Sequence, residues 1–337
     1  MLTGHLPQIR YATGFSGSSG LALISRSAPI LLVDSRYTAQ ALKETRGVEI
    51  REVTGKREEG AALALRELGA QRIGFEAERT SVAFLSRLQA RTSRKMQWLP
   101  QEDWLDGLRA VKEAAELARL QKAAELASHA CLLLMQWIRP GRMELEIAAE
   151  LECWMRKQGA EKLSFDPVIA SGPRSGFPHS RASACRIPRR GWVVVDFGAV
   201  FQGYSSDMTR TFHLGKPDQV WQHRYRAVRQ AQELAIASLH PGQRSDQLYL
   251  LVQKFLKRRQ LDTRFTHGLG HGIGLELHES PSLSCKKVSR LEAGMVMTVE
   301  PGIYFPGRAG MRIEDMVLLT PDGARPLTEF PRDLIVL

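Results

Sequence analysis

The chain has 337 residues, of which 43% are hydrophobic and 25% are charged, with a formal net charge of +11. This is the composition of an ordinary globular protein with room for about two domains. No apolar run approaches the ~20 residues that span a bilayer, and the first residues lack the basic and apolar regions of a signal peptide. The basic residues are scattered, so we expect neither a nucleic-acid nor a membrane partner. Four cysteines without a C-x-x-C pair indicate reduced thiols in a cytoplasmic protein.

The first 104 residues alternate short apolar runs with helical patterns. We predict strands over 21–25, 30–34, 48–53, 72–76 and 96–99, and helices over 35–45, 58–68 and 81–91. This order predicts a small α/β domain with a mixed sheet over residues 1–104. The turn at 15–20 lacks the Gly-Lys-Ser/Thr ending of a phosphate-binding loop, which excludes that function for it.

The remaining residues, 105–337, read as a larger α+β domain. One long charged helix is predicted over 105–138, ended by Pro140-Gly141, and we expect it to bridge the two domains. An amphipathic helix follows over 144–158. From Phe165 onward the chain is rich in strands, interrupted by helices over 219–239 and 245–259.

Acidic residues stand in two strand–turn–strand patterns of this domain. Asp196 belongs to the buried-looking strand 191–199, Asp207 follows eleven residues later, and 201–203 has the residues of a turn. A hairpin folded near Phe201/Gln202 sets position 196 opposite 207, with the side chains about 5 Å apart. Like charges at that distance must protonate or share a cation, because an unpaired buried carboxylate costs several kcal/mol.

The same pattern recurs near the end of the chain. Glu300 ends one strand, Glu314 lies near the start of the next, and pairing about Gly307 places them opposite each other. Taken alone, each acid of the two patterns has a simpler interpretation as a turn-capping or solvated carboxylate. The repetition of the pattern favours a shared cation.

Between the two patterns, residues 266–279 contain His267, His271 and His278 among several glycines. Each glycine costs roughly 1 kcal/mol in a helix interior, so this is not the two-histidine helix of common zinc peptidases. We predict a tight loop that runs into a strand, with its backbone close to something small. Two aspartates, two glutamates and one histidine suit two divalent ions such as Mn²⁺, and less obviously Zn²⁺ or Co²⁺.

These stretches resemble the pita-bread metallopeptidases, the family of methionine aminopeptidase, prolidase and aminopeptidase P. The resemblance rests on residues 195–199, 206–210, 267–271, 299–302 and 312–315, which match the family's five ligand motifs. Residues 9–17 and 33–37 resemble the amino-terminal domain of its proline-specific branch. The implied fold is a small creatinase-like α/β domain over 1–104, followed by a pita-bread catalytic domain of the creatinase/aminopeptidase type over 105–337.

The resemblance also implies a role for each matched residue. Asp196 and Asp207 would bind one metal, His271 and Glu300 would complete one metal shell, and Glu314 would bridge both ions. A metal-bridging hydroxide would attack the peptide, with Glu300 as general base. His179, His267 and His278 match substrate-side histidines, whose simpler interpretation is a satisfied loop or core histidine. Arg312 would balance charge beside the ligands.

The implied substrates are short peptides with proline at the second position, and the implied assembly is a homodimer. Members of this branch usually have a further helix and strand before residue 9, so we expect either a misplaced start or a sheet that lacks an edge. Several prolidase-like members have a basic residue where this chain has Ser282. A cation would help to bind a dipeptide's carboxylate, so its absence favours a Xaa-Pro aminopeptidase of the aminopeptidase P type.

Three alternatives remain open from the sequence: a Xaa-Pro dipeptidase (prolidase), a non-catalytic peptide- or protein-binding module on the same fold, and a methionine aminopeptidase. Loss of ligand residues would be expected of a binding module, and none is lost. The amino-terminal domain argues against a methionine aminopeptidase.

Overall fold

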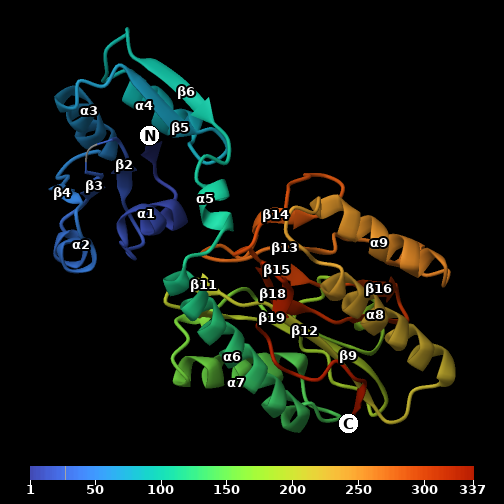
Figure 1. The fold of residues 1–337 in the computed structure, drawn as a ribbon. Helices are drawn as coiled ribbons and strands as arrows, with labels where there is room; N and C mark the ends of the chain where they lie inside the picture. Colours follow the sequence, from blue (N-terminus) through green and yellow to red (C-terminus); the bar gives the residue numbers. More distant parts are fainter. Residues whose placement is uncertain (27) are drawn as a thin grey trace. The chain divides into compact units, whose positions relative to one another are not determined.

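The computed structural model describes residues 1–26 and 28–337. The chain divides into two compact units, Met1–Gly107 and Leu108–Leu337, which we call unit 1 and unit 2 (Figure 1). The domain boundary expected after residue 104 stays a prediction. None of the described helices is both long and apolar enough to cross a membrane.

Unit 1 is built on one mixed sheet of six strands in the order β4-β3-β2-β1-β5-β6. Strand β1 lies between β2 and β5, so the first strand of the chain is internal and β4 and β6 are the edges of the sheet. The expectation of a misplaced start or a missing edge stays a prediction. In chain order the elements are β1 (Leu2–Thr3), α1 (Leu6–Thr13), β2 (Leu21–Leu23), β3 (Ile30–Val33), α2 (Thr38–Glu44), β4 (Glu49–Glu52), α3 (Arg57–Glu67), β5 (Arg72–Glu76), α4 (Val82–Gln89) and β6 (Gln97–Gln101).

The helices of unit 1 cover both faces of this sheet. Successive strand residues point to opposite faces, so Ile30 and Leu32 pack with α3 and α4, whereas Leu31 and Val33 pack with α1 and α2. Two-sided burial explains why these strands appear in the sequence as continuous apolar runs.

The predicted continuous helix over 105–138 is wrong, because the chain forms two helices with a break between them. Helix α5 (Asp106–Ala110) ends before Val111, which pairs with Met295 as an isolated β-bridge. The N–H of Lys112 donates to Gly294 O at 2.9 Å. Helix α6 (Ala114–Trp137) then begins at a capping box formed by Glu113 and Glu116. Backbone pairing with residues far along the chain thus overrides local helix propensity.

Unit 2 contains several sheets, of which the largest have the orders β14-β13-β15-β18-β19 and β20-β12-β9-β8. The first is antiparallel throughout, whereas in the second β20 pairs parallel to β12 and the other pairs are antiparallel. The predicted helices and the strand-rich character after Phe165 are confirmed. The remaining elements are α7 (Glu144–Lys157), β7 (Lys162–Leu163), β8 (Val168–Ser171), η1 (Gly172–Gly176), β9 (Gly191–Phe197), β10 (Ala199–Phe201), β11 (Tyr204–Ser205), β12 (Met208–Leu214), α8 (Gln219–Ala237), α9 (Ser245–Lys257), η2 (Asp262–Arg264), β13 (Gly270–Gly272), β14 (Glu279–Leu283), β15 (Val296–Val299), β16 (Gly302–Phe305), β17 (Ala309–Arg312), β18 (Asp315–Thr320), β19 (Gly323–Pro326) and β20 (Ile335–Val336).

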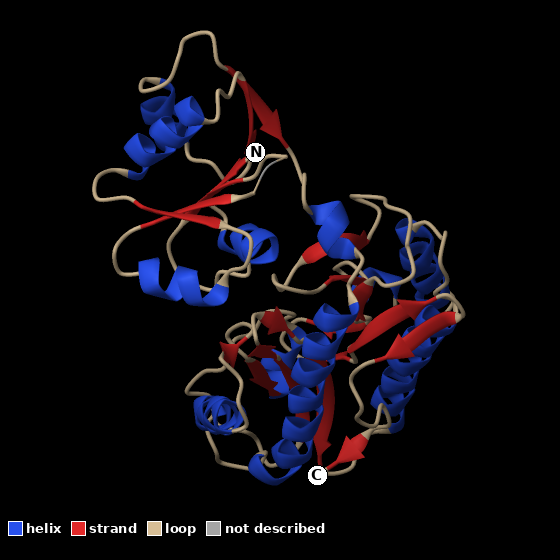
Figure 2. Cartoon of the chain, turned by 60° about the vertical axis from the view of Figure 1, so that its left-hand side comes forward, coloured by secondary structure: helices blue, strands red, loops and turns tan. Residues whose placement is uncertain are grey.

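Two helix pairs cover the strands of unit 2 (Figure 2). Helices α6 and α7 pack on β9 and β12 through residues such as Leu134 and Val195, and α8 and α9 pack on β15 to β17 through residues such as Val228 and Met297. The strand ends between these two cores are where the predicted acidic residues lie.

The hairpin with Glu300 and Glu314 is confirmed. The pairs Val299↔Asp315 and Gly302↔Arg312 flank these residues and keep one register, so Glu300 lies opposite Glu314. Gly307, with φ of +71°, sits in the connecting turn between Phe305 and Ala309.

The register predicted for the other hairpin is wrong by two residues, because Asp196 pairs with Thr209 and not with Asp207. The turn consists of Gln202 and Gly203, which both have positive φ (+46° and +84°), as a tight two-residue hairpin turn requires. Moving the turn centre by one residue shifts the partner strand by two. Asp207 therefore stays on the same sheet face as Asp196 but lies diagonal to it.

Candidate metal centre

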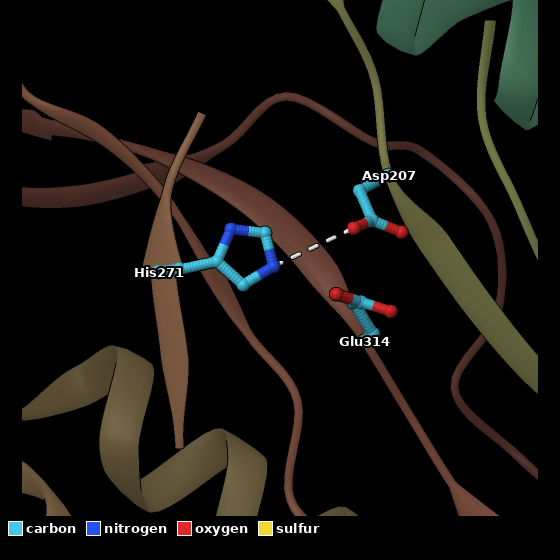
Figure 3. A group of neighbouring side chains, drawn as sticks. All are labelled: Asp207, His271 and Glu314. Atoms are coloured by element: carbon cyan, nitrogen blue, oxygen red, sulfur yellow. Dashed lines mark ion pairs between the residues drawn. The ribbon is translucent and has the colours of Figure 1, made fainter. Parts of the chain in front are cut away.

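Asp207, His271 and Glu314 point toward one another from three separate segments of unit 2 (Figure 3). Asp207 directly precedes β12, His271 is the middle residue of β13, and Glu314 lies between β17 and β18. One potential ligand atom from each residue falls within 4.8 Å of the others. His271 Nε2 is 3.6 Å from Asp207 Oδ2.

Glu300 and Asp196 complete the group of five predicted ligands. Glu300 Oε1 lies 3.5 Å from His271 Nε2, and Asp196 Oδ2 accepts a hydrogen bond of 2.5 Å from Arg312 Nη2. All five side chains line one cavity of about 580 Å³. The structure therefore brings together the set that the two strand patterns and the glycine-rich loop indicated.

Three of the four carboxylates of this group are buried, and each of these three has one oxygen without a hydrogen-bond partner in the described part of the chain. Asp196 Oδ1, Asp207 Oδ1 and Glu314 Oε1 have no hydrogen-bond partner among the described residues. Burial, followed by the charges of Glu314, Asp196 and Glu300, raises the pKa of Asp207 well above its ordinary value. Burial and the charges of Glu300 and Asp196 do the same to the pKa of Glu314. A divalent cation would supply the missing partner and offset the repulsion, so the residues fit a metal.

Arg312 lies beside the carboxylates, as predicted, and is itself held by several groups. It donates to Asp196 Oδ2, to Thr209 Oγ1 at 2.9 Å and to the Tyr304 hydroxyl at 2.6 Å. Thr209 Oγ1 donates in turn to Glu314 Oε2 at 2.6 Å. Neither Thr209 nor Tyr304 was predicted. Because strand residues alternate, Tyr304 shares a face with Glu300 and Gly302, which is the signal that could have revealed it.

The three further histidines line the same cavity. His267 Nε2 lies 3.1 Å from the Tyr304 hydroxyl, and the rings of His271 and His278 are 4.1 Å apart. Burial lowers the pKa of His267, His271 and His278, which favours neutral imidazoles, the form that binds metal ions. His179 lies at the cavity wall, beside Pro178.

The glycines around His271 are explained by the neighbouring strands. A Cβ on Gly270 would lie 1.9 Å from Thr298 O, and one on Gly272 would lie 2.1 Å from Ser280 O. The backbone of β13 thus approaches other backbone, where the sequence suggested a close approach to a small ligand. The loop that runs into a strand is confirmed.

A charged wall of the cavity was also missed. Arg181 lines it together with Asp166, and Arg181 Nη1 lies 3.0 Å from Asp166 Oδ2. Ser282, singled out for its lack of charge, belongs to the same lining. Arg181 therefore offers the cation that position 282 does not.

A cluster of carboxylates and a histidine that lines one cavity is a ligand set typical of metal-dependent hydrolases. Comparison with known families gives the same class. Residues 118–321 match metallopeptidase family M24, and residues 1–111 match the creatinase/prolidase N-terminal domain. The chain belongs to metallopeptidase family M24, with the pita-bread catalytic fold and the creatinase-like N-terminal domain that the sequence motifs indicated.

Relatives and solved structures match this chain over nearly its full length. It is 35% identical to a Xaa-Pro dipeptidase of Pyrococcus horikoshii, over 98% of this chain and 92% of that protein. The structure of a Xaa-Pro dipeptidase from Bacillus anthracis has a TM-score of 0.96 and 37% identity, covering 100% of this chain and 94% of the other. An X-Pro aminopeptidase from Thermotoga maritima has a TM-score of 0.92 and 36% identity, covering 100% and 97%.

Proposed function

We propose that this metallopeptidase is a Xaa-Pro dipeptidase, which hydrolyses dipeptides whose second residue is proline. The observation that carries this choice is the full-length match to proteins with that name, in sequence and in structure. It replaces our first expectation of an aminopeptidase P, which rested on the absence of a cation at Ser282. Manganese as the native metal, a homodimer and a cytoplasmic location belong to the same proposal.

Two divalent ions would be held by the side chains of the candidate metal centre, namely Asp196, Asp207, His271, Glu300 and Glu314. When bound, such ions polarise a peptide carbonyl and lower the pKa of water. Four carboxylates balance the charge of two such ions, and the match to a metallopeptidase family supports a metal at this site. The orphaned oxygens of Asp196, Asp207 and Glu314 support this assignment.

Side chains of the protein itself carry out proton transfer, charge stabilisation and substrate binding. Glu300, beside His271, accepts the proton of the attacking water as general base. His267, held by the Tyr304 hydroxyl and by Gly268 O at 2.7 Å, steadies the oxygen that gains charge, with His278 on the proline side. His179 contacts the substrate from the opposite wall, and Arg312 fixes the orientation of Asp196.

The charge on the cavity wall supports a dipeptide in particular. A Xaa-Pro dipeptide carries its carboxylate one residue from the scissile bond, so an enzyme that prefers it needs a cation close to the metal centre. Arg181 lies on the lining of that cavity, with its side chain 76% exposed and its Nη1 3.0 Å from Asp166 Oδ2. Arg181 would supply this cation from a different segment of the chain than the one that contains Ser282.

The test is a comparison of Ala-Pro with Ala-Pro-Ala in manganese, with Asp207→Ala as the inactive control. A higher kcat/KM for the dipeptide supports the proposal. Preference for the tripeptide moves the assignment to aminopeptidase P, for which Ser282 and the Thermotoga structure are the supporting observations. Cleavage of Met-Ala with the proline peptides intact indicates a methionine aminopeptidase. Absence of any cleavage by protein that carries metal indicates a binding module.

A further inference from the structure

A second cavity, of about 550 Å³, lies in unit 2 on α8 and the turn that follows α9, two helices that run side by side (Figure 1). Its charged lining residues are Arg224, Arg226 and Arg259, joined by His223. The lining formed by the described residues contains no carboxylate. It is thus a cationic cavity that the peptidase chemistry does not use.

Two of the three guanidinium groups, those of Arg224 and Arg259, are held by aromatic rings or an amide. Arg224 lies 4.4 Å from the Trp221 ring centre and 4.2 Å from that of Phe305. Arg259 lies 3.7 Å from the ring centre of Phe255, and its Nη2 donates to Gln230 Oε1 at 3.4 Å. Stacking fixes a guanidinium while leaving its donors available, so these groups are preorganised for a ligand.

Among the described residues, no acidic side chain forms an ion pair with Arg224, Arg226 or Arg259. Arg229, on the same helix, is instead paired with both Glu233 and Asp333. The nearby Asp218 caps α8 by accepting from the Trp221 N–H at 2.9 Å. The arginines of the cavity thus differ from Arg229, whose charge is balanced by acidic partners.

Two more arginines extend the positive charge around Phe305. Arg264 lies 5.0 Å from the centre of that ring, and Arg308 belongs to the turn between β16 and β17. Burial, and then the charges of Arg308 and Arg264, lower the pKa of Arg224, although Asp218 opposes them. Like charges gathered in this way repel one another, and a bound anion would relieve the repulsion.

We propose that the α8–α9 cavity binds a small anion carrying two or more phosphate groups. A guanidinium fork matches two phosphate oxygens, and three forks around one cavity exceed what a single phosphate can use. The cavity has the size of a small-molecule site. The proposal is independent of the peptidase specificity, because none of its residues belongs to the metal-centre cavity.

The probe is inorganic tripolyphosphate, titrated by calorimetry into the full-length, manganese-loaded protein. The test variant is Arg226→Gln/Arg259→Gln, which spares Arg224 because that side chain packs between two rings. The matched control is Lys254→Gln/Arg258→Gln, which removes the same number of charges at the end of α9 from residues outside the cavity lining. We expect the test variant to bind about tenfold or more weakly, and the control to change by less than about threefold.

Several results would overturn the proposal. Equal weakening in both variants would mean attraction by net charge, and unchanged binding in both would place the anion on the metal ions. An RNA oligonucleotide that binds where tripolyphosphate does not would indicate a nucleic-acid surface. If the test variant does not fold, Arg226→Lys/Arg259→Lys keeps the charge and removes the forks. It is then expected to lose binding relative to wild type, and full retention would count against the cavity.

Discussion

Single hydroxyl groups decide how firmly the candidate metal ligands are held. Thr209 Oγ1 donates to Glu314 Oε2 and accepts from Arg312 Nε, which places one hydroxyl between a carboxylate and its cation. Arg312 in turn holds Asp196. Loss of a group that orients a metal ligand typically lowers metal affinity by about 10- to 100-fold.

We expect Thr209→Val, which keeps the shape of the side chain and removes its hydroxyl, to weaken binding of Mn²⁺ by about 10- to 100-fold. Equilibrium dialysis followed by metal analysis measures this. The control is Thr211→Val on the same strand, since Thr211 bonds only the backbone of Arg312 and no carboxylate. Equal affinity in the Thr209 variant and wild type would contradict the assigned role.

Arg181 gives a prediction about substrate length. Because its side chain is exposed, Arg181→Gln should raise KM for Ala-Pro by only about two- to fivefold, with kcat little changed. KM for Ala-Pro-Ala should change less, because its carboxylate lies one residue further away. The control is Arg186→Gln, whose guanidinium donates to Gly141 O and does not line the cavity. An unaltered KM for the dipeptide would remove Arg181 from substrate binding.

The residues that the sequence revealed at this site are those whose chemistry is unusual for their position. An acid at the end of a buried strand, such as Asp196 or Glu300, is costly without a partner, so the sequence alone marks it as a candidate ligand. Thr209 and Tyr304 are ordinary strand residues, so their importance appears only when folding brings Arg312 against them. Arg181 is likewise one of many scattered arginines until folding places it on the cavity wall.

The two hairpins show where prediction of strand register succeeds and fails. Around Gly307 the register follows from one glycine at the turn, and Glu300 faces Glu314 as expected. In the other hairpin, we centred the turn one residue too early because Gln202 adopts positive φ, which is uncommon without glycine. Both hairpins still deliver their acids to the same cavity, since a shift by two preserves the sheet face.

The break between α5 and α6 places charged side chains where a continuous helix could not. Arg109 Nη1 lies 2.8 Å from Glu276 Oε2, Arg109 Nη2 also contacts Glu279, and Lys112 Nζ lies 3.1 Å from Glu279 Oε2. The side chains of Arg109, Lys112 and Glu279 are at most 5% exposed. Glu276 and Glu279 flank His278, so these ion pairs hold the segment that presents it.

We expect Arg109→Met to lower the free energy of unfolding by about 3 kcal/mol, because it removes the buried cation that pairs with Glu276 and Glu279 and leaves Lys112 as the remaining cation beside Glu279. Denaturant unfolding measures this, and kcat for Ala-Pro should fall as His278 loses its fixed position. Arg109→Lys should recover part of both losses. The control is Arg244→Met, whose ion pair with Asp246 is exposed and should contribute less than about 1 kcal/mol. Equal losses of stability in the two methionine variants would contradict the distinction between buried and exposed ion pairs.

Among the described residues, most of the buried acidic side chains lie in unit 2, and unit 1 buries only Glu58 and Glu76. Asp207 and Glu314 are 5% and 1% exposed and carry the pKa increases that burial and mutual repulsion produce. The sheet of unit 1 instead buries apolar residues on both faces. The residue pattern of each half indicated its fold class, but only the meeting of distant strands shows where the candidate metal ligands gather.

Removal of the metal ions should therefore destabilise unit 2 selectively. At free metal 100-fold above Kd, binding adds about 2.7 kcal/mol per site, so chelation should lower the melting temperature. Amide hydrogen exchange should become faster in β9, β13, β15 and β18, with β2, β3 and β5 of unit 1 unchanged.

The Asp207→Asn variant distinguishes the effect of metal binding on stability from the effect of repulsion between the carboxylates. It removes a ligand and one buried charge, so its melting temperature should no longer respond to manganese and should equal or exceed that of metal-free wild type. Faster exchange in both units after chelation, or a variant less stable than metal-free wild type, would show that carboxylate repulsion is not the cause.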